Sequence, residues 1–114
     1  MSPRVDAPTV DLVTAFLVER YLSRRDLDVF ARSSELARLS ADELSRRGTA
    51  VQHLRSIFVP ADETCFYLYE ALWPDNVREA AERAALPFER LSEAVLGPDL
   101  NARVMAATVR ASCR

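Results

Sequence analysis

Several features that define common protein classes are missing from this sequence. It has no lysine, one histidine, two glycines and two cysteines, and its longest apolar stretches have the length of strands, too short to span a membrane. Cys65 and Cys113 provide neither a disulfide framework nor the ligand spacing of a zinc site. There is also no glycine-rich phosphate loop, serine-centred elbow or Cys-x-x-Cys motif. Nucleotide hydrolysis, serine hydrolysis and thioredoxin-type chemistry therefore have no support.

The charge distribution and the amino terminus argue against further classes. All fifteen basic residues are arginine, but they are scattered among seventeen carboxylates and the net charge is −2. A nucleic-acid-binding protein normally has a basic stripe or a positive balance. Residues 1–11 lack the basic start and the apolar run of a secretory signal. We therefore expect a cytoplasmic protein with reduced cysteines that binds neither nucleic acid nor a membrane.

The length of 114 residues has room for one globular domain. We expect a flexible N-terminal extension over residues 1–11, a folded domain over 12–97 and a C-terminal extension over 98–114. In the C-terminal extension, apolar residues recur at helical spacing after Asp99, which is typical of a short amphipathic helix. Such a helix would form a lid or reach a partner, and a frayed terminus is the alternative.

Hydrophobic periodicity predicts four strands and two helices. The expected strands are 12–21, 51–59, 64–71 and 88–96, and the expected helices are 24–47 and 74–85. Within the first helix, Ser40 and Glu43 form a capping-box pattern, so one long helix and a helix that restarts after a kink both fit. The resulting βαββαβ order predicts an α+β, ferredoxin-like fold, in which two helices cover one face of a four-stranded antiparallel sheet.

Side chains alternate along a strand, so each expected strand divides into two sets. One set is apolar and should face the helices: Phe16, Val18, Leu54, Phe58, Phe66, Leu68, Leu91 and Val95. The other set is mixed and contains Leu17, Glu19, Tyr21, Val51, His53, Arg55, Ile57, Cys65, Tyr67, Tyr69, Arg90, Ser92 and Ala94. A face left to water would lose its large apolar residues, so we expect a second copy or a ligand to cover this mixed face. The alternative is that these residues only pack a dimer interface, with Arg55 paired to Glu19.

Five short segments between residues 15 and 96 occur in an order that is also found in a known family. They are Phe16–Tyr21, His53–Ser56, the region from Val59 to Phe66, Val77–Ala80 and Arg83–Arg90. These segments resemble a family of small bacterial nickel-binding-like proteins, most of which have no assigned role. The resemblance implies a homodimer in which two ferredoxin-like sheets face each other and close a dimeric α/β barrel. Related dimeric barrels include heme-dependent enzymes, cofactor-free monooxygenases and polyketide cyclases, so the architecture does not select one chemistry.

The first expected function is that of a small dimeric ligand-binding protein, with nickel or another divalent transition metal as one candidate ligand. Imidazole, thiolate and carboxylate groups are the donors that such a metal would use. The candidate metal ligands are His53, Glu19 and Cys65. A hydrogen-bonded packing role for His53 is the alternative.

The second expected function is that of a cofactor-independent cyclase or isomerase in natural-product biosynthesis, acting on a polyketide-like intermediate. In the catalytic set, His53 would exchange a proton and Glu19 would orient it or act as a base, while Arg55 and Tyr67 would stabilise an oxyanion. Further candidate ligand-binding residues are Tyr21, Cys65, Tyr69 and Arg90. A third hypothesis is a regulatory or structural dimer without a ligand. For Cys65, no helix N-terminus or basic cluster nearby in the sequence favours a nucleophilic thiolate, so a small buried side chain is expected.

Overall fold

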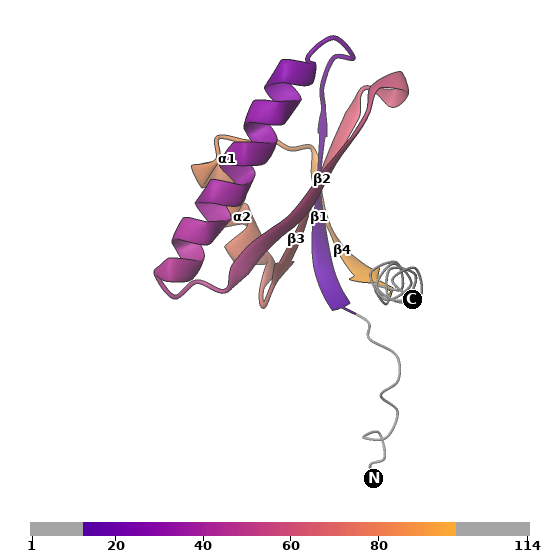
Figure 1. Cartoon of the computed structure of the whole chain (residues 1–114). Coiled ribbons are helices and arrows are strands. Elements are labelled where there is room, and N and C mark those ends of the chain that lie inside the picture. Colours follow the sequence, from indigo (N-terminus) through magenta and orange to yellow (C-terminus); the bar gives the residue numbers. More distant parts are fainter. Residues whose placement is uncertain (1–12, 98–114) are drawn as a thin grey trace, which may run out of the picture. The chain divides into compact units, whose positions relative to one another are not determined.

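The computed structural model describes residues 13–97 of the chain (Figure 1). Thr14–Val95 form one compact unit, and the architecture below is that of this unit. The predicted N-terminal extension and the predicted C-terminal helix lie outside the described residues. Within the described range, neither helix is long and apolar enough to cross a membrane.

The described elements follow the predicted order of strands and helices. They are β1 (Val13–Tyr21), α1 (Leu27–Arg46), β2 (Val51–Val59), the short 3-10 helix η2 (Pro60–Asp62), β3 (Thr64–Ala71), α2 (Pro74–Arg83) and β4 (Arg90–Leu96). Helix α1 is continuous through Ser40 and Glu43, so the single long helix is the correct one of the two alternatives. The fold is α+β and compatible with the ferredoxin-like arrangement.

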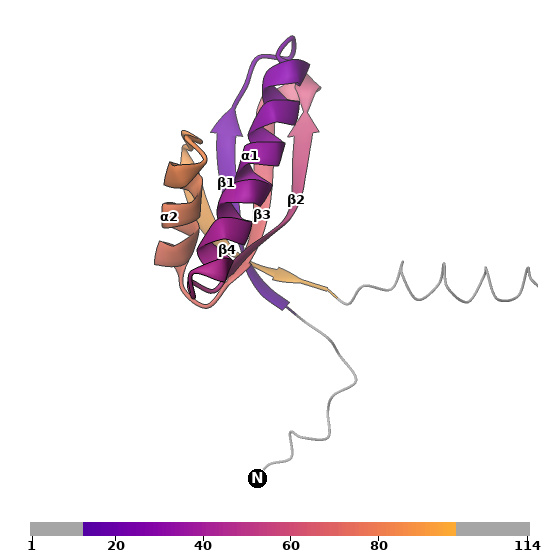
Figure 2. The same ribbon diagram turned by 60° about the vertical axis from the view of Figure 1, so that its left-hand side comes forward.

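The four strands form one sheet with the order β2-β3-β1-β4. Strand β3 is antiparallel to both β1 and β2, with Val18 opposite Tyr67 and Phe58 opposite Cys65. Figures 1 and 2 show both helices on the same face of this sheet. We call this the helix face. The opposite face, called the open face below, is not covered by any element within residues 13–97.

Helix α1 packs on the sheet through a stripe of small and apolar side chains. Ala37, Ala41 and Leu44 are buried at steps of three and four, which places them on one side of the helix. The helix ends where Gly48 adopts a φ of 99°, and the Thr49 amide donates to the Leu44 carbonyl at 2.9 Å. This left-handed residue closes the helix as a glycine C-cap does.

The core lies between the sheet and the two helices, and two tyrosines dominate it. Tyr67 and Tyr69 on β3 are fully buried, at 0% exposure each. The helices meet them with small residues, because the buried positions of α2 are Val77, Ala80 and Ala81 and those of α1 include two alanines. Large rings from the sheet therefore fill the space that alanine-lined helices leave.

The β2–β3 connection is tied to the segment that follows β1. Glu63 adopts a left-handed φ of 51° at the end of η2, and its carbonyl accepts from the Leu22 amide at 2.9 Å. The Glu63 carboxylate also accepts from the Arg24 amide at 3.1 Å. These contacts hold the tip of the β2–β3 hairpin beside the segment that leads into the N-terminus of α1.

Candidate functional site

The strand register identifies the side chains of the open face. Leu17, Glu19 and Tyr21 of β1 lie opposite Leu68, Phe66 and Thr64 of β3, which in turn lie opposite Arg55, Ile57 and Val59 of β2. Tyr21 is 63% exposed and Ile57 is 44% exposed, while Leu17, Phe66 and Leu68 are half-buried. The open face is thus an apolar surface across three strands with a few charged groups set into it.

Glu19 and Arg90 form the one ion pair that the described residues place on this face. The Arg90 Nε atom lies 3.5 Å from the Glu19 Oε1 atom. The Glu19 side chain is only 22% exposed, whereas that of Arg90 is 68% exposed. The Glu89 amide also donates to the Glu19 carbonyl at 2.7 Å, which fixes the approach to β4 against β1. A carboxylate is therefore held at a defined place between apolar neighbours.

Arg55 stands apart from this ion pair. It lies opposite Leu68, on β2, and β3 separates its strand from the strand of Glu19. Arg55 and Glu19 are separated by two strand spacings, or about 10 Å, and within one chain the Glu19 carboxylate pairs with Arg90 and not with Arg55. Among residues 13–97, no ion pair involves the Arg55 guanidinium.

Four of the predicted site residues lie on the helix face, and their expected placement on the mixed face is wrong. Cys65, Tyr67 and Tyr69 are each 0% exposed within the core. They share their side of the sheet with Phe16 and Val18, which were correctly expected there. Phe66 and Leu68, expected beneath the helices, occupy the open face instead. Both alternating sets of β3 are largely apolar, so alternation alone did not distinguish them.

A β-bulge explains why His53 also faces the helices. In β2, His53 pairs with Tyr69 and Arg55 pairs with Leu68, so Leu54 is an additional residue in the strand. Beyond it the alternation is shifted by one, because a bulge sets two residues against one on the neighbouring strand. His53 and Ser56, three residues apart, consequently share one face. Val51 lies on that face as well and is buried.

His53 is held by hydrogen bonding and aromatic packing. Its Nε2 atom lies 2.9 Å from the Ser56 Oγ atom, and its ring meets the Tyr69 ring edge-on with centroids 5.4 Å apart. Burial lowers the pKa of His53, and the nearby Arg38 guanidinium lowers it further, while Asp42 raises it. A neutral histidine with a hydroxyl partner fits the hydrogen-bonded packing role that was the alternative to a metal ligand.

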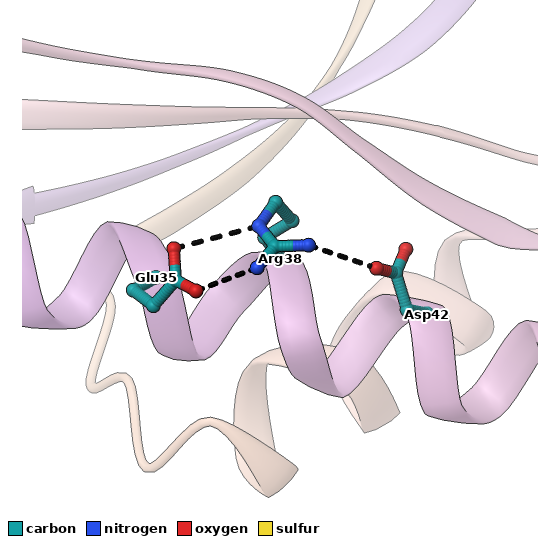
Figure 3. Close-up of polar contacts among 3 residues, drawn as sticks. All are labelled: Glu35, Arg38 and Asp42. Carbon is teal, nitrogen blue, oxygen red and sulfur yellow. Dashed lines mark hydrogen bonds and ion pairs between the residues drawn. The ribbon is translucent and has the colours of Figure 1, made fainter.

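The charges beside His53 belong to a chain of ion pairs on α1 (Figure 3). The Arg38 side chain lies between two carboxylates, with Nη1 3.2 Å from Oδ2 of Asp42 and Nη2 2.5 Å from Oε2 of Glu35. All three side chains are about half exposed, so solvent screens these pairs. The hydrogen bond from Arg38, and then its positive charge, lower the pKa of Glu35. This group of ion pairs was not predicted from the sequence, although the spacing of three and four residues on a helix is a signal for it.

The three candidate metal ligands do not come together within one chain. Glu19 lies on the open face, whereas His53 and Cys65 lie on the helix face. Along β3, Cys65 is four residues from Tyr69, the partner of His53, which corresponds to about 13 Å. No group of three or more His, Cys, Asp or Glu side chains suited to a metal ion occurs in the described part of the chain.

Cys65 has the surroundings of an unreactive thiol. Its side chain is fully buried, and burial raises its pKa above the usual value. A thiol reacts as the thiolate, so a raised pKa disfavours a nucleophilic role. The expectation that Cys65 is a small buried side chain agrees with this environment.

Comparisons with family models, with curated proteins and with solved structures gave no match to this chain. The family resemblance of the five segments therefore stays a prediction, and so do nickel binding and the dimeric barrel. Of the predicted residues, the open face brings together Glu19, Tyr21, Arg55 and Arg90.

Proposed function

We propose that two copies of this chain pair through their open faces and bind a small organic ligand between the two sheets. The observation that carries this proposal is the contrast between the two faces of the sheet. Two helices cover one face, and the other exposes Tyr21 and Ile57 over half-buried Leu17, Phe66 and Leu68. An antiparallel sheet that faced only water would carry mainly polar side chains there.

The charges on the open face favour a second copy of this chain as the occupant. Glu19 and Glu70 share the surface with Arg55 and Arg90, so the face carries both signs. A two-fold axis brings the same patch of each protomer together, which requires a self-complementary surface. The family resemblance of the five segments implies the same arrangement.

The side chains between the paired sheets define the class of ligand. Leu17, Ile57, Phe66 and Leu68 supply apolar walls, and Arg55 supplies a cation that no carboxylate of residues 13–97 neutralises. Ligand sites commonly combine apolar walls with a few polar groups. The ligand is accordingly an organic molecule with a largely apolar body and an anionic or carbonyl oxygen.

A second candidate function is that of the cofactor-independent cyclase or isomerase, with a smaller catalytic set. Glu19 and Arg55 lie on the same face, separated by about two strand spacings, or about 10 Å. That separation suits a ring-sized substrate between a base and a group that stabilises an oxyanion. His53 and Tyr67 have no part in this reaction, because they lie on the other side of the sheet.

Light scattering on matched variants tests the pairing. Ile57→Glu places a charge on the open face, and Leu36→Glu places one on α1, where Leu36 is exposed to a similar extent, 46% against 44%. We expect wild type and Leu36→Glu to have twice the chain mass of 12.8 kDa, and Ile57→Glu to be a monomer with an unchanged circular dichroism spectrum. Equal masses for the two variants contradict the proposed interface.

The fluorescent dye 8-anilinonaphthalene-1-sulfonate tests the ligand class, since it combines an aromatic body with an anionic group. We expect bound dye on the wild-type dimer and weaker binding by Arg55→Gln, with no loss for Arg78→Gln on the exposed side of α2. Each variant should first show cooperative unfolding, because partly folded proteins also bind this dye. Equal binding by the two arginine variants contradicts the role of Arg55.

A further inference from the structure

A serine and a histidine of β2 share a hydrogen bond at the edge of the sheet. The Nε2 atom of His53 lies 2.9 Å from the Oγ atom of Ser56. The bulge at Leu54 places these two side chains on one face, although they are three residues apart. Strand β2 is the outermost strand in the order β2-β3-β1-β4, so one side of the pair has no neighbouring strand within residues 13–97. Both residues are partly exposed, in contrast to the fully buried Tyr67 and Tyr69.

The groups around His53 come from β3 and α1. The Tyr69 ring of β3 meets the imidazole edge-on, with centroids 5.4 Å apart, and restricts its orientation. Burial lowers the pKa of His53 most, the Arg38 guanidinium of α1 lowers it further, and the Asp42 carboxylate of α1 raises it. The ring is therefore mainly neutral at pH 7. The negative charge of Asp42 stabilises the imidazolium that forms when the ring takes up a proton.

A hydroxyl beside a neutral imidazole is the arrangement that activates a serine for nucleophilic attack. A serine hydroxyl is a weak nucleophile until a base accepts its proton, and such pairs typically lie about 2.6–3.2 Å apart. When the ring proton of His53 is on Nδ1, the Nε2 atom accepts from the Ser56 hydroxyl. Neither the proposed ligand site on the open face nor the cyclase reaction uses this pair.

We propose that Ser56 is a nucleophile toward small activated acyl esters, with His53 as its general base. The Ser56 Oγ atom forms a bond to the acyl carbon while its proton passes to Nε2 of His53. The bond between the acyl carbon and the ester oxygen then breaks, and the departing alcohol takes the proton from Nε2. A water molecule attacks the acyl-serine in the same way, which releases the carboxylic acid and restores the Ser56 hydroxyl. This site lies on the helix face and does not depend on the proposed dimer.

The reagent p-nitrophenyl acetate tests the site on the full-length protein. Mass spectrometry of the intact protein and of its peptides locates the acetyl group, and nitrophenolate absorbance gives the rate. The chain has no lysine, so acetylation of lysine amines does not interfere. We expect one acetyl group on Ser56 in wild type and none in Ser56→Ala. For His53→Gln the acylation rate should fall at least tenfold, since a general base contributes about 10²–10⁴-fold.

Ser40→Ala is the matched control, because Ser40 is a partly exposed serine of α1. We expect it to react at the wild-type rate, and circular dichroism should show that each variant is folded. An unmodified wild-type protein, or an acetyl group on any residue other than Ser56, would mean that the hydrogen bond only packs the strand and would overturn the proposal. This mapping uses wild type alone, so it decides even if Ser56→Ala does not fold. Equal acylation rates for wild type and His53→Gln would also overturn it.

Discussion

Truncation of Tyr69 tests which face of β3 lies in the core. The side chain is fully buried beneath the helices, whereas strict alternation from the sequence placed it on the open face. Removing a buried aromatic side chain typically costs about 3–5 kcal/mol. A domain of about 85 residues has a total stability of about 4–13 kcal/mol. Tyr69→Ala therefore removes a large part of the stability and should lower Tm by more than about 12 °C.

Two further variants serve as comparisons. One removes only the hydroxyl of Tyr69, and the other changes an exposed residue outside the core. The Tyr69 hydroxyl has no partner among the described residues, so Tyr69→Phe should cost less than about 1 kcal/mol or stabilise the protein. Glu82→Ala, at an exposed position of α2, should change stability by no more than about 0.5 kcal/mol.

The assay for these variants is urea unfolding followed by far-UV circular dichroism, at one protein concentration. The slope of the free energy of unfolding against urea concentration should be the same in each variant, since unfolding exposes a similar surface area in all of them. A loss below about 1 kcal/mol for Tyr69→Ala would refute the placement of this ring in the core.

The remaining predictions concern His53. Its folded-state pKa is depressed, chiefly by burial, so its contribution to stability is present above the unfolded-state value of about 6.5 and is lost as pH falls through the folded-state pKa. The free energy of unfolding, measured with urea, should therefore fall more between pH 7.5 and pH 5.5 for wild type than for His53→Gln. Equal decreases in the two proteins would contradict the depressed pKa. NMR titration of the His53 ring should give a higher pKa in Arg38→Gln and a lower one in Asp42→Asn, with Arg46→Gln as a control, because Arg38 lowers and Asp42 raises this pKa. Shifts in the opposite directions would contradict the assigned neighbours.

The order of elements could be predicted from the sequence because each element carries a local signal. Pro74 begins α2 at its first turn, and Gly48 follows α1 in a left-handed conformation that glycine adopts readily. Helix α1 was predicted three residues too early, because the turn at Ser23–Asp26 precedes it. Local propensity and capping therefore defined the fold class well.

The two faces of the sheet were only partly predictable, because they depend on how the strands pair and pack. For β1, alternation placed Phe16 and Val18 correctly beneath the helices. For β3, the tyrosines and the Phe66–Leu68 pair are similarly apolar, and the choice depends on the room left by alanines on both helices. The bulge at Leu54 has no glycine to mark it, so the shift that turns His53 toward α1 has no clear sequence signal.

The candidate site was also predicted only in part. The open face keeps four of the predicted residues, Glu19, Tyr21, Arg55 and Arg90. They could be grouped because alternation assigned the side chains of β1 and of the second half of β2 to the correct faces. The other four, His53, Cys65, Tyr67 and Tyr69, lie on the helix face. The bulge in β2 and the similar apolarity of the two sets of β3 explain why they were misplaced.

The most direct test of the proposed function is the molecular mass of the wild-type protein in solution, measured by sedimentation equilibrium over a wide concentration range. Pairing through the open face predicts a mass of twice 12.8 kDa that falls toward the single-chain value only on dilution. A mass of 12.8 kDa at every concentration would contradict it.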